Sequence, residues 1–177
     1  MSAMQTEQLE NEKTGAPKTF SQLAELYVAG LFTQDGWRVY FPHSDDGFDF
    51  IAAKLLPDGV LLRPVQVKGK YPKGDKSDKN VYGYIGELSQ IHPEMVLAIP
   101  YFATSDLPVL RHVAFMPFYK IGKHARGLKC EPAKFIAGAA SPRRDQLKYF
   151  DREGLQRLSN RDWSKEALAN DLVEKDV

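Results

Sequence analysis

The sequence predicts a mixed α/β fold, or the related α+β class, in which helices pack against a central mixed β-sheet. Three observations support this class: an apolar stripe at helical spacing near the N-terminus, a hairpin-like pair of strand segments after it, and two apolar strand segments beyond. The expected order is helix, three strands, helix and two strands, followed by short C-terminal helices. The 177 residues are 43% hydrophobic and 27% charged, which excludes a wholly disordered chain, a collagen-like chain and a coiled-coil rod.

The chain is expected to form one domain with a flexible N-terminal tail. Residues 1–16 show no periodicity and few apolar side chains, as is typical of such a tail. Residues 17–177 contain no internal repeat and no long linker, so we expect a single domain of ordinary size. That domain divides into a core at 19–118, a basic C-terminal extension at 119–161 and a terminal helix at 162–177.

The first helix is expected to begin near Thr19 and to end at Asp35 and Gly36. Thr19 and Gln22 have the spacing of a capping box, in which two side chains satisfy free N–H groups at a helix start. Glycine tolerates the left-handed conformation that often follows a helix, which makes Gly36 a natural stop. The apolar stripe between these ends consists of Phe20, Leu23, Ala24, Tyr27, Val28, Leu31 and Phe32.

Three strands should follow this helix. Residues 37–41 are aromatic and β-branched, and residues 48–56 and 60–70 are apolar runs joined by Leu-Pro-Asp-Gly at 56–59. Proline, aspartate and glycine in this order favour a tight turn. The two longer strands should therefore pair as a hairpin.

The second half of the chain alternates expected helices and strands. Residues 71–80 are polar and should form a solvated loop, in which Ser77 would cap a second helix. One face of that helix would carry Val81, Tyr84, Ile85, Leu88 and Ile91, although Gly83 and Gly86 disfavour a helix. Strands are expected at 95–102 and 111–118, irregular basic chain at 119–146, and short helices near 151–159 and 164–173.

The net charge of +1 conceals two basic blocks. Residues 63–79 carry a net charge of +4 and residues 111–161 carry +8, with acidic stretches on either side. Such blocks can contact the phosphates of a nucleic acid. A soluble surface rich in lysine is the plainer interpretation of the same charges.

Four polar residues interrupt the apolar pattern. Glu25 lies at the rim of the helical stripe, and Asp49 lies near the start of the second strand. Gln66 and Lys68 are two residues apart on the third strand, so their side chains project from one face. The hairpin would bring Asp49 beside them across the ladder. Taken singly, each is also consistent with an ordinary solvated or turn residue.

In this order the residues resemble the PD-(D/E)XK nuclease superfamily, which has the restriction-endonuclease-like fold. The resemblance consists of Gly-x-Asp ending at Asp49, a short hairpin, and Gln-Val-Lys at 66–68. The upstream Glu25 is similar to the first-helix glutamate of archaeal Holliday-junction resolvases. The resemblance covers roughly residues 19–102, and it has one departure: Gln66 stands where the superfamily usually has an acidic residue.

The resemblance implies a metal-dependent endonuclease that hydrolyses DNA phosphodiester bonds. It assigns catalysis to Glu25, Asp49, Gln66 and Lys68. Mg²⁺, for which Mn²⁺ can substitute, would be held by Glu25, Asp49, Gln66 and the backbone carbonyl of Val67, since Mg²⁺ prefers oxygen ligands. Lys68 would orient or help deprotonate the attacking water. Because Gln66 removes one negative charge, we expect cleavage to require millimolar metal.

The expected partner is DNA, with RNA as an alternative, and a homodimer is a further expectation because cutting two strands usually needs two sites. Candidate phosphate contacts are Lys70, Lys73, Lys76, Lys79, Arg143 and Arg144. No apolar run approaches the ~18 residues of a membrane span, and a single cysteine favours a cytoplasmic protein. The competing hypothesis is a catalytically inactive nucleic-acid-binding or interaction module built on the same fold, which Gln66 favours.

Overall fold

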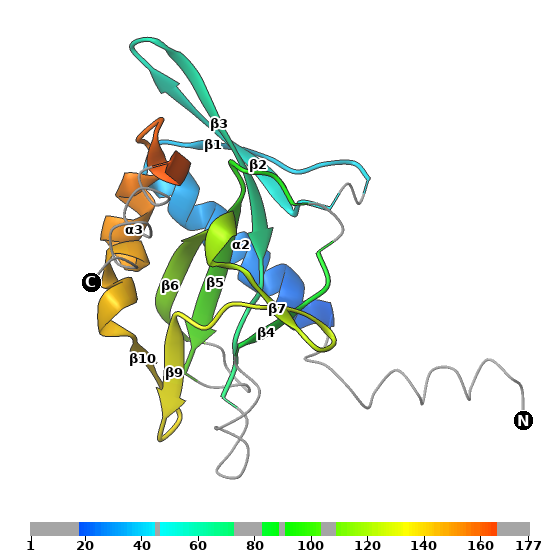
Figure 1. Cartoon of the computed structure of the whole chain (residues 1–177). Coiled ribbons are helices and arrows are strands. Elements are labelled where there is room, and N and C mark those ends of the chain that lie inside the picture. Colours follow the sequence, from blue (N-terminus) through cyan, green and yellow to red (C-terminus); the bar gives the residue numbers. More distant parts are fainter. Residues whose placement is uncertain (1–17, 45–46, 73–82, 89–90, 104–108, 166–177) are drawn as a thin grey trace, which may run out of the picture.

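The computed structural model describes residues 18–44, 47–72, 83–88, 91–103 and 109–165 (Figure 1). The tail expected at 1–16 and most of the terminal helix expected at 162–177 lie outside these residues. The predicted phosphate contacts Lys73, Lys76 and Lys79 also lie outside them. Within the described residues, no helix is long and apolar enough to cross a membrane.

The mixed α/β class is confirmed: a five-stranded sheet is accompanied by two small sheets and by helices. The helices are α2 (Lys18–Gln34) and α3 (Asp151–Arg157), with the 3₁₀ turns η2 (Phe118–Lys120) and η3 (Arg144–Tyr149). The strands are β1 (Arg38–Tyr40), β2 (Phe50–Leu56), β3 (Gly59–Val67), β4 (Tyr84–Gly86), β5 (Val96–Phe102), β6 (Leu110–Pro117), β7 (Gly122–His124), β8 (Gly127–Lys129), β9 (Ala133–Ile136) and β10 (Ala139–Pro142).

The large sheet has the strand order β1-β2-β3-β5-β6. Strands β1, β2 and β3 are antiparallel, β3 and β5 are parallel, and β5 and β6 are antiparallel again. The predicted hairpin is confirmed, with Leu56 opposite Gly59 at its turn. The φ angle of Gly59 is +129°. Residues with a Cβ atom rarely adopt this value, so this tight turn requires glycine.

Helix α2 ends at the glycine that the sequence indicates. Gly36 has a φ angle of +82°, and its N–H donates to the Thr33 carbonyl at 3.1 Å, while the Trp37 N–H donates to the Phe32 carbonyl at 3.0 Å. These two bonds satisfy carbonyls that would otherwise lack partners at the helix end. The reversal turns Trp37 and Phe32 into the same core, with their rings 5.6 Å apart.

The two faces of the large sheet are covered by different elements. On one face, buried side chains of α2 and of the segment at 155–163 pack on β2, β3, β5 and β6. On the other face, a second core joins β5 and β6 to the small sheets β4-β8-β7 and β9-β10 and to η3. Every residue of β5 is consequently buried.

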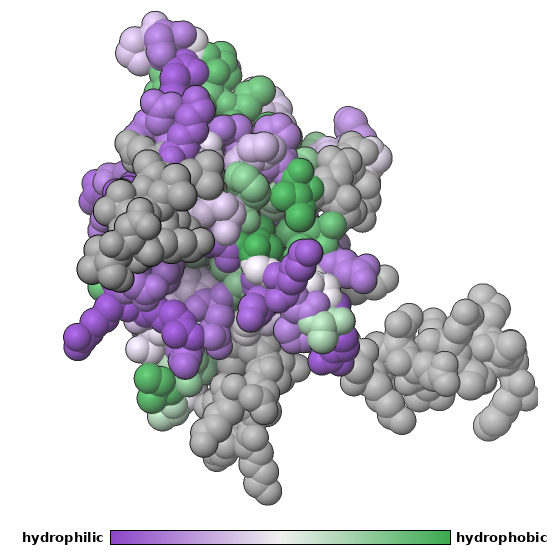
Figure 2. Space-filling model, viewed as in Figure 1, coloured by the Kyte–Doolittle hydropathy of each residue, from purple (hydrophilic) through white to green (hydrophobic). Residues whose placement is uncertain are grey.

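The second face of β1, β2 and β3 is more exposed. Phe50 and Ala52 belong to the core under α2, so the alternate residues of β2 point to the other side. On that side several apolar side chains remain exposed. They are Tyr40, Leu55, Val60 and Leu62, and we call this side the open face. Figure 2 shows a hydrophobic patch over β2 and β3 in this view.

The second helix predicted around 81–91 is wrong for the described residues 83–88. They contain strand β4, which pairs with β8. The Gly83 carbonyl accepts the Cys130 N–H at 2.7 Å, and Gly86 has a φ angle of +82°, which is incompatible with a helix interior. The basic segment at 119–146 also differs from expectation, because it forms four short strands instead of irregular chain.

A buried arginine anchors the end of the described chain to the sheet. Arg63 of β3 has no exposed surface. Its guanidinium donates to the carbonyls of Leu158 at 3.2 Å and Asn160 at 2.6 Å, pairs with Glu94, and lies 5.2 Å from the centre of the Trp163 ring. The expected helix at 151–159 is confirmed as α3. Residues 163–165 are helical, and the rest of the helix predicted near 164–173 lies outside the described residues.

The single cysteine should be chemically inert in the folded protein. Burial raises the pKa of the Cys130 thiol to about 12, so almost none of it is the reactive thiolate near neutral pH. We expect iodoacetamide to label Cys130 only after unfolding, as measured by the mass of the intact protein with and without urea. Complete labelling of the native protein would contradict this expectation.

Candidate active site

The four predicted catalytic residues line one pocket. The hollow has a volume of about 410 Å³ and lies at the start of β2, where the last residues of β3 extend past the first residue of β2. It is surrounded by Glu25, Asp49, Gln66 and Lys68. Helix α2 contributes Glu25 on one side, and Tyr84, Ile85 and Gly86 of β4 close the opposite side. Residues from three separate parts of the chain are therefore brought to one small region, as the sequence predicts.

Asp49 is held firmly at the floor of this pocket. Its N–H donates to the Val65 carbonyl at 2.9 Å, which extends the β2–β3 ladder by one residue. Its carboxylate oxygen Oδ2 accepts hydrogen bonds from Gln66 Nε2 at 2.8 Å and from the Val67 N–H at 2.5 Å. Charge-assisted bonds of this kind fix the carboxylate and stabilise its ionised form.

The alternation along β3 decides which side chains reach the pocket. Val65 and Val67 are buried in the core beneath α2, so Gln66 and Lys68 project to the opposite side. The backbone of Lys68 is fixed because its N–H donates to the Ala98 carbonyl of β5 at 2.9 Å. Gln66 is buried at 8% exposure, with its amide group bonded to Asp49.

Glu25 approaches the pocket because a glycine faces its helix. A Cβ atom added at Gly69 would lie 3.1 Å from the Cβ of Ala24, so a larger residue there would push α2 slightly away from the chain after β3. Partial burial raises the pKa of the Glu25 carboxyl above its ordinary value, and the charge of Asp49 raises it further, whereas Lys68 lowers it. The Asp49 carboxylate and the Lys68 amine thus lie close enough to act on the Glu25 carboxyl.

We expect Glu25→Gln to stabilise the metal-free protein near neutral pH. The pKa of Glu25 is raised above 4.5 in the folded state, so folding favours the protonated form, and stability is lost as the pH rises through the raised pKa. Urea denaturation in EDTA should show a gain at about pH 7 that disappears below about pH 4. The exposed Glu153→Gln should show no such gain, and an unchanged Glu25→Gln midpoint at neutral pH would contradict the expectation.

The oxygen atoms around the pocket fit a hard divalent cation. Glu25 and Asp49 supply carboxylates, and Gln66 can supply its amide oxygen if the amide rotates away from Asp49. The Val67 N–H faces Asp49, and the carbonyl of an extended residue points to the same strand edge as its N–H, which brings the Val67 carbonyl to this side. In the described part of the chain, no three His, Cys, Asp or Glu side chains cluster, so amide and backbone oxygens must complete such a site.

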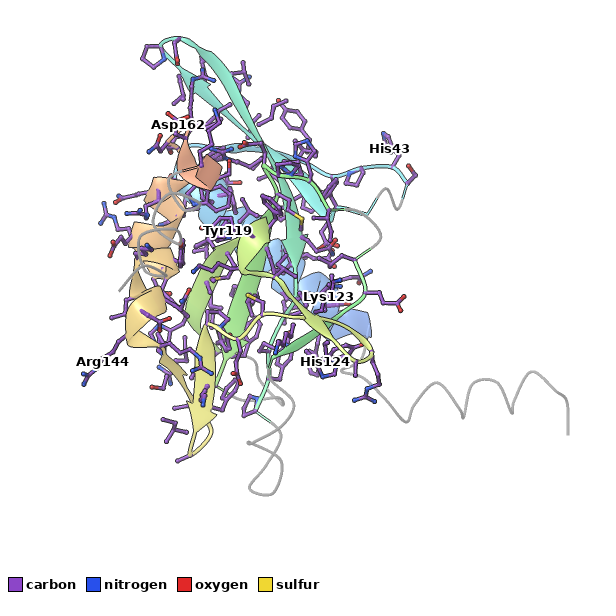
Figure 3. All side chains as sticks on the ribbon, in the orientation of Figure 1. His43, Tyr119, Lys123, His124, Arg144 and Asp162 are labelled. Atoms are coloured by element: carbon purple, nitrogen blue, oxygen red, sulfur yellow. The ribbon has the colours of Figure 1, made fainter. Side chains whose placement is uncertain are left out.

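The predicted phosphate contacts that can be placed differ from one another. Lys70 lines the pocket and donates from Nζ to the Tyr84 carbonyl. Arg143 instead pairs with Glu131 and donates to its carbonyl at 2.7 Å. Arg144 is exposed at the start of η3 and points away from the body of the protein (Figure 3). Neither arginine lines the pocket, so of these three residues only Lys70 belongs to the site.

Sequence patterns did not predict that Tyr84 and part of the basic segment meet at the rim of the pocket. The ring of Tyr84 lies 5.0 Å from the ring of His124 and 5.8 Å from the Arg126 guanidinium, and its hydroxyl donates to the Arg126 carbonyl at 2.9 Å. Lys123 and His124 project from the same β7–β8 hairpin (Figure 3). The dense run of basic residues at 120–129 was the available signal, but the incorrect helix around Tyr84 concealed its position.

A second hollow, of about 520 Å³, lies between α2, β6 and α3. It contains His112 and Asp151, whose Nδ1 and Oδ2 atoms are 2.8 Å apart. The other Asp151 oxygen accepts the Val113 N–H at 2.9 Å. Both oxygens therefore tie α3 to β6, and we regard this pair as structural.

No protein-family model matches the chain, and no curated protein does either. We therefore base the function on the pocket described above and on the residues that meet there.

Proposed function

We propose that this protein is a metal-dependent endonuclease that hydrolyses phosphodiester bonds in DNA, built on a restriction-endonuclease-like core. One observation carries the proposal: Glu25, Asp49, Gln66 and Lys68, which the resemblance selects, line the same pocket. The raised pKa of Glu25, caused mainly by partial burial and to a lesser degree by the Asp49 carboxylate, supports it further, because a cation bound there would stabilise both ionised carboxylates.

Each residue has a role that follows from its position. Glu25, Asp49, Gln66 and the Val67 carbonyl would hold Mg²⁺ or Mn²⁺, which when bound neutralises charge on the phosphate and lowers the pKa of water. Asp49 is already fixed by two donors, so it would orient the other ligands. The Lys68 amine would position the attacking water and stabilise the negative charge that develops on the phosphate oxygens.

Restoring the usual acidic residue should strengthen metal binding. We expect Gln66→Glu to lower the Mg²⁺ concentration that gives half-maximal cleavage by roughly tenfold, because ligand charge tunes cation affinity. In EDTA the same variant should melt at a lower temperature, since it replaces a hydrogen bond to Asp49 by repulsion between two carboxylates. A Mg²⁺ titration of cleavage and a thermal melt in EDTA measure both effects, and tighter binding by the unmodified protein would contradict them.

The test of the proposal is cleavage of supercoiled plasmid, linear duplex and single-stranded DNA with Mg²⁺, Mn²⁺ or EDTA. We expect cleavage that requires metal, that Lys68→Met abolishes, and that Lys134→Met, at an exposed position of β9, leaves unchanged. Absence of cutting on every substrate, together with retention of DNA that does not depend on metal, would reject the enzyme.

The competing function is a nucleic-acid-binding or interaction module that does not cut. The observation that favours it is the Gln66 amide nitrogen facing Asp49 at 2.8 Å, which lets an uncharged donor satisfy the Asp49 carboxylate without a cation. The cleavage test separates the two functions. Under the first proposal we also expect a homodimer and a cytoplasmic location, since double-strand cutting needs paired sites and the chain has no disulfide to form.

A further inference from the structure

The open face begins directly beside the pocket. Tyr40 of β1 lies opposite Ile51 of β2, which in turn lies opposite Pro64 of β3. Residues opposite one another in a sheet project from the same face, so these three side chains form a row on the face turned away from α2. Tyr40 ends this row at the sheet edge with 54% of its surface exposed.

The rows of the open face form a continuous track that starts at the site. Asp49 and Gln66, two residues from Ile51 and Pro64, form the row in the pocket. Rows along a strand are separated by roughly 7 Å, twice the rise per residue. Beyond the Tyr40 row, Leu62 continues the apolar track at 55% exposure. An apolar surface thus leads from the pocket along β2 and β3 toward the hairpin turn.

The other side of the pocket is basic. Strand β4, which closes the pocket, pairs with β8 of the β7–β8 hairpin. That hairpin carries the exposed Lys123, His124 and Arg126, the last two of which contact the Tyr84 ring at the pocket wall. Figure 2 shows hydrophilic surface in the region of this hairpin, next to the hydrophobic patch over β2 and β3, and Figure 3 labels Lys123 and His124 there.

An apolar face that meets a basic rim at the proposed site suits one substrate class. A single strand of nucleic acid presents both a charged backbone and the flat faces of its bases, and single-strand binders combine basic grooves with aromatic platforms. In a duplex the base faces are stacked inside, so an apolar sheet would gain no contact. A partner protein could cover the apolar face but would not need the cationic rim.

We infer that the substrate of this site is an unpaired nucleic-acid strand, whose bases lie on the open face against Tyr40 while its backbone follows the β7–β8 hairpin into the pocket. The inference rests on the proposed function for the chemistry, and it adds the substrate class. Arg38, which is exposed on the open face two residues before Tyr40, can hold a phosphate beyond the stacked base.

Binding in EDTA tests this inference without any cleavage. We expect the fluorescence anisotropy of a labelled oligothymidylate to report at least about tenfold tighter binding than that of a duplex of equal length. Tyr40→Ala should weaken single-strand binding by roughly tenfold, because one stacked base is lost, and Tyr40→Phe should restore it. Arg126→Ala should weaken binding and make it less dependent on salt, whereas the exposed Leu147→Ala, outside the open face, should change nothing.

The outcomes separate this inference from the proposed function. Binding that depends on the Tyr40 ring, without cutting of any DNA, would reject the nuclease and retain the single-strand track. Metal-dependent cutting of duplex at an undiminished rate, with Tyr40→Ala equal to the unmodified protein on single strands, would retain the nuclease and overturn the track. Equal or tighter binding of duplex would also overturn it, as would association of the protein into a dimer that Tyr40→Ala disrupts without affecting DNA binding.

Discussion

Replacement of Asp49 by asparagine is expected to slow DNA cleavage by about 10³-fold while leaving the fold intact. Asparagine has the size of aspartate, and its side-chain oxygen can still accept the Val67 N–H that Asp49 accepts at 2.5 Å. The substitution removes one of the two carboxylate charges in the pocket, and an uncharged amide is a much weaker ligand for a hard cation. The loss should therefore appear in the chemical step and not in stability.

The measurement is the single-turnover cleavage rate at saturating Mg²⁺, compared with thermal melting of the same preparation in EDTA. Asp58→Asn is a matched control, because Asp58 lies at the turn of the same hairpin and pairs with Arg161 on the surface. We expect this control to cut at the unmodified rate. If Asp49→Asn retained a rate within tenfold of the unmodified protein, Asp49 would not be a metal ligand and the proposed site would be wrong.

Replacement of Arg63 by methionine is expected to destabilise the protein by about 3–5 kcal/mol, because a fully buried guanidinium loses three bonds of roughly 1–1.5 kcal/mol each. Methionine has a similar length but no donor, so the carbonyls of Leu158 and Asn160 and the carboxylate of Glu94 would each lose a partner. Buried polar groups without partners account for most of this loss. In a domain of this size the melting temperature should fall by about 10 °C or more.

Arg161→Met is the matched control for this second prediction. Arg161 follows Asn160, a carbonyl partner of Arg63, and it also joins the C-terminal segment to the β2–β3 hairpin through an ion pair with Asp58. Both side chains of this pair are exposed. Exposed ion pairs contribute little because water and salt screen them, so we expect only a small change in the urea midpoint. Equal losses for Arg63→Met and Arg161→Met would mean that burial of Arg63 contributes nothing special to stability.

Local sequence patterns predicted most of the large sheet and the centre of the candidate site. The stop at Gly36 and the hairpin turn at Gly59 depend on backbone angles that few residues other than glycine adopt, and such signals are visible in the sequence. The alternation of Gln66 and Lys68 with buried valines depends on the fixed period of a strand. Asp49 was placed because a hairpin fixes its own register once the turn is known.

Patterns failed where the structure depends on distant pairing. Tyr84 and Ile85 fit a helical stripe and a strand equally well, and β8, more than forty residues later in the chain, selected the strand. Arg143 is a candidate phosphate contact because it is basic, yet in the structure it pairs with Glu131, twelve residues earlier in the chain. In the sequence Arg63 belongs to a basic block, whereas in the structure it is buried and bonded to the Leu158 and Asn160 carbonyls, 95 and 97 residues later in the chain. Local periodicity carries no information on such contacts.

The distance between Arg63 and its carbonyl partners also has a consequence for the order in which the protein is made. Ribosomes add roughly 5–20 residues per second, so the 95 residues that separate Arg63 from Leu158 correspond to a delay of roughly 5–20 s. During this interval the newly made chain already contains Glu25, Asp49, Gln66 and Lys68. Arg63, however, still lacks the Leu158 and Asn160 carbonyls that satisfy its guanidinium in the core. The part of β3 around Arg63 should thus reach its full stability only after Leu158 and Asn160 have been synthesised.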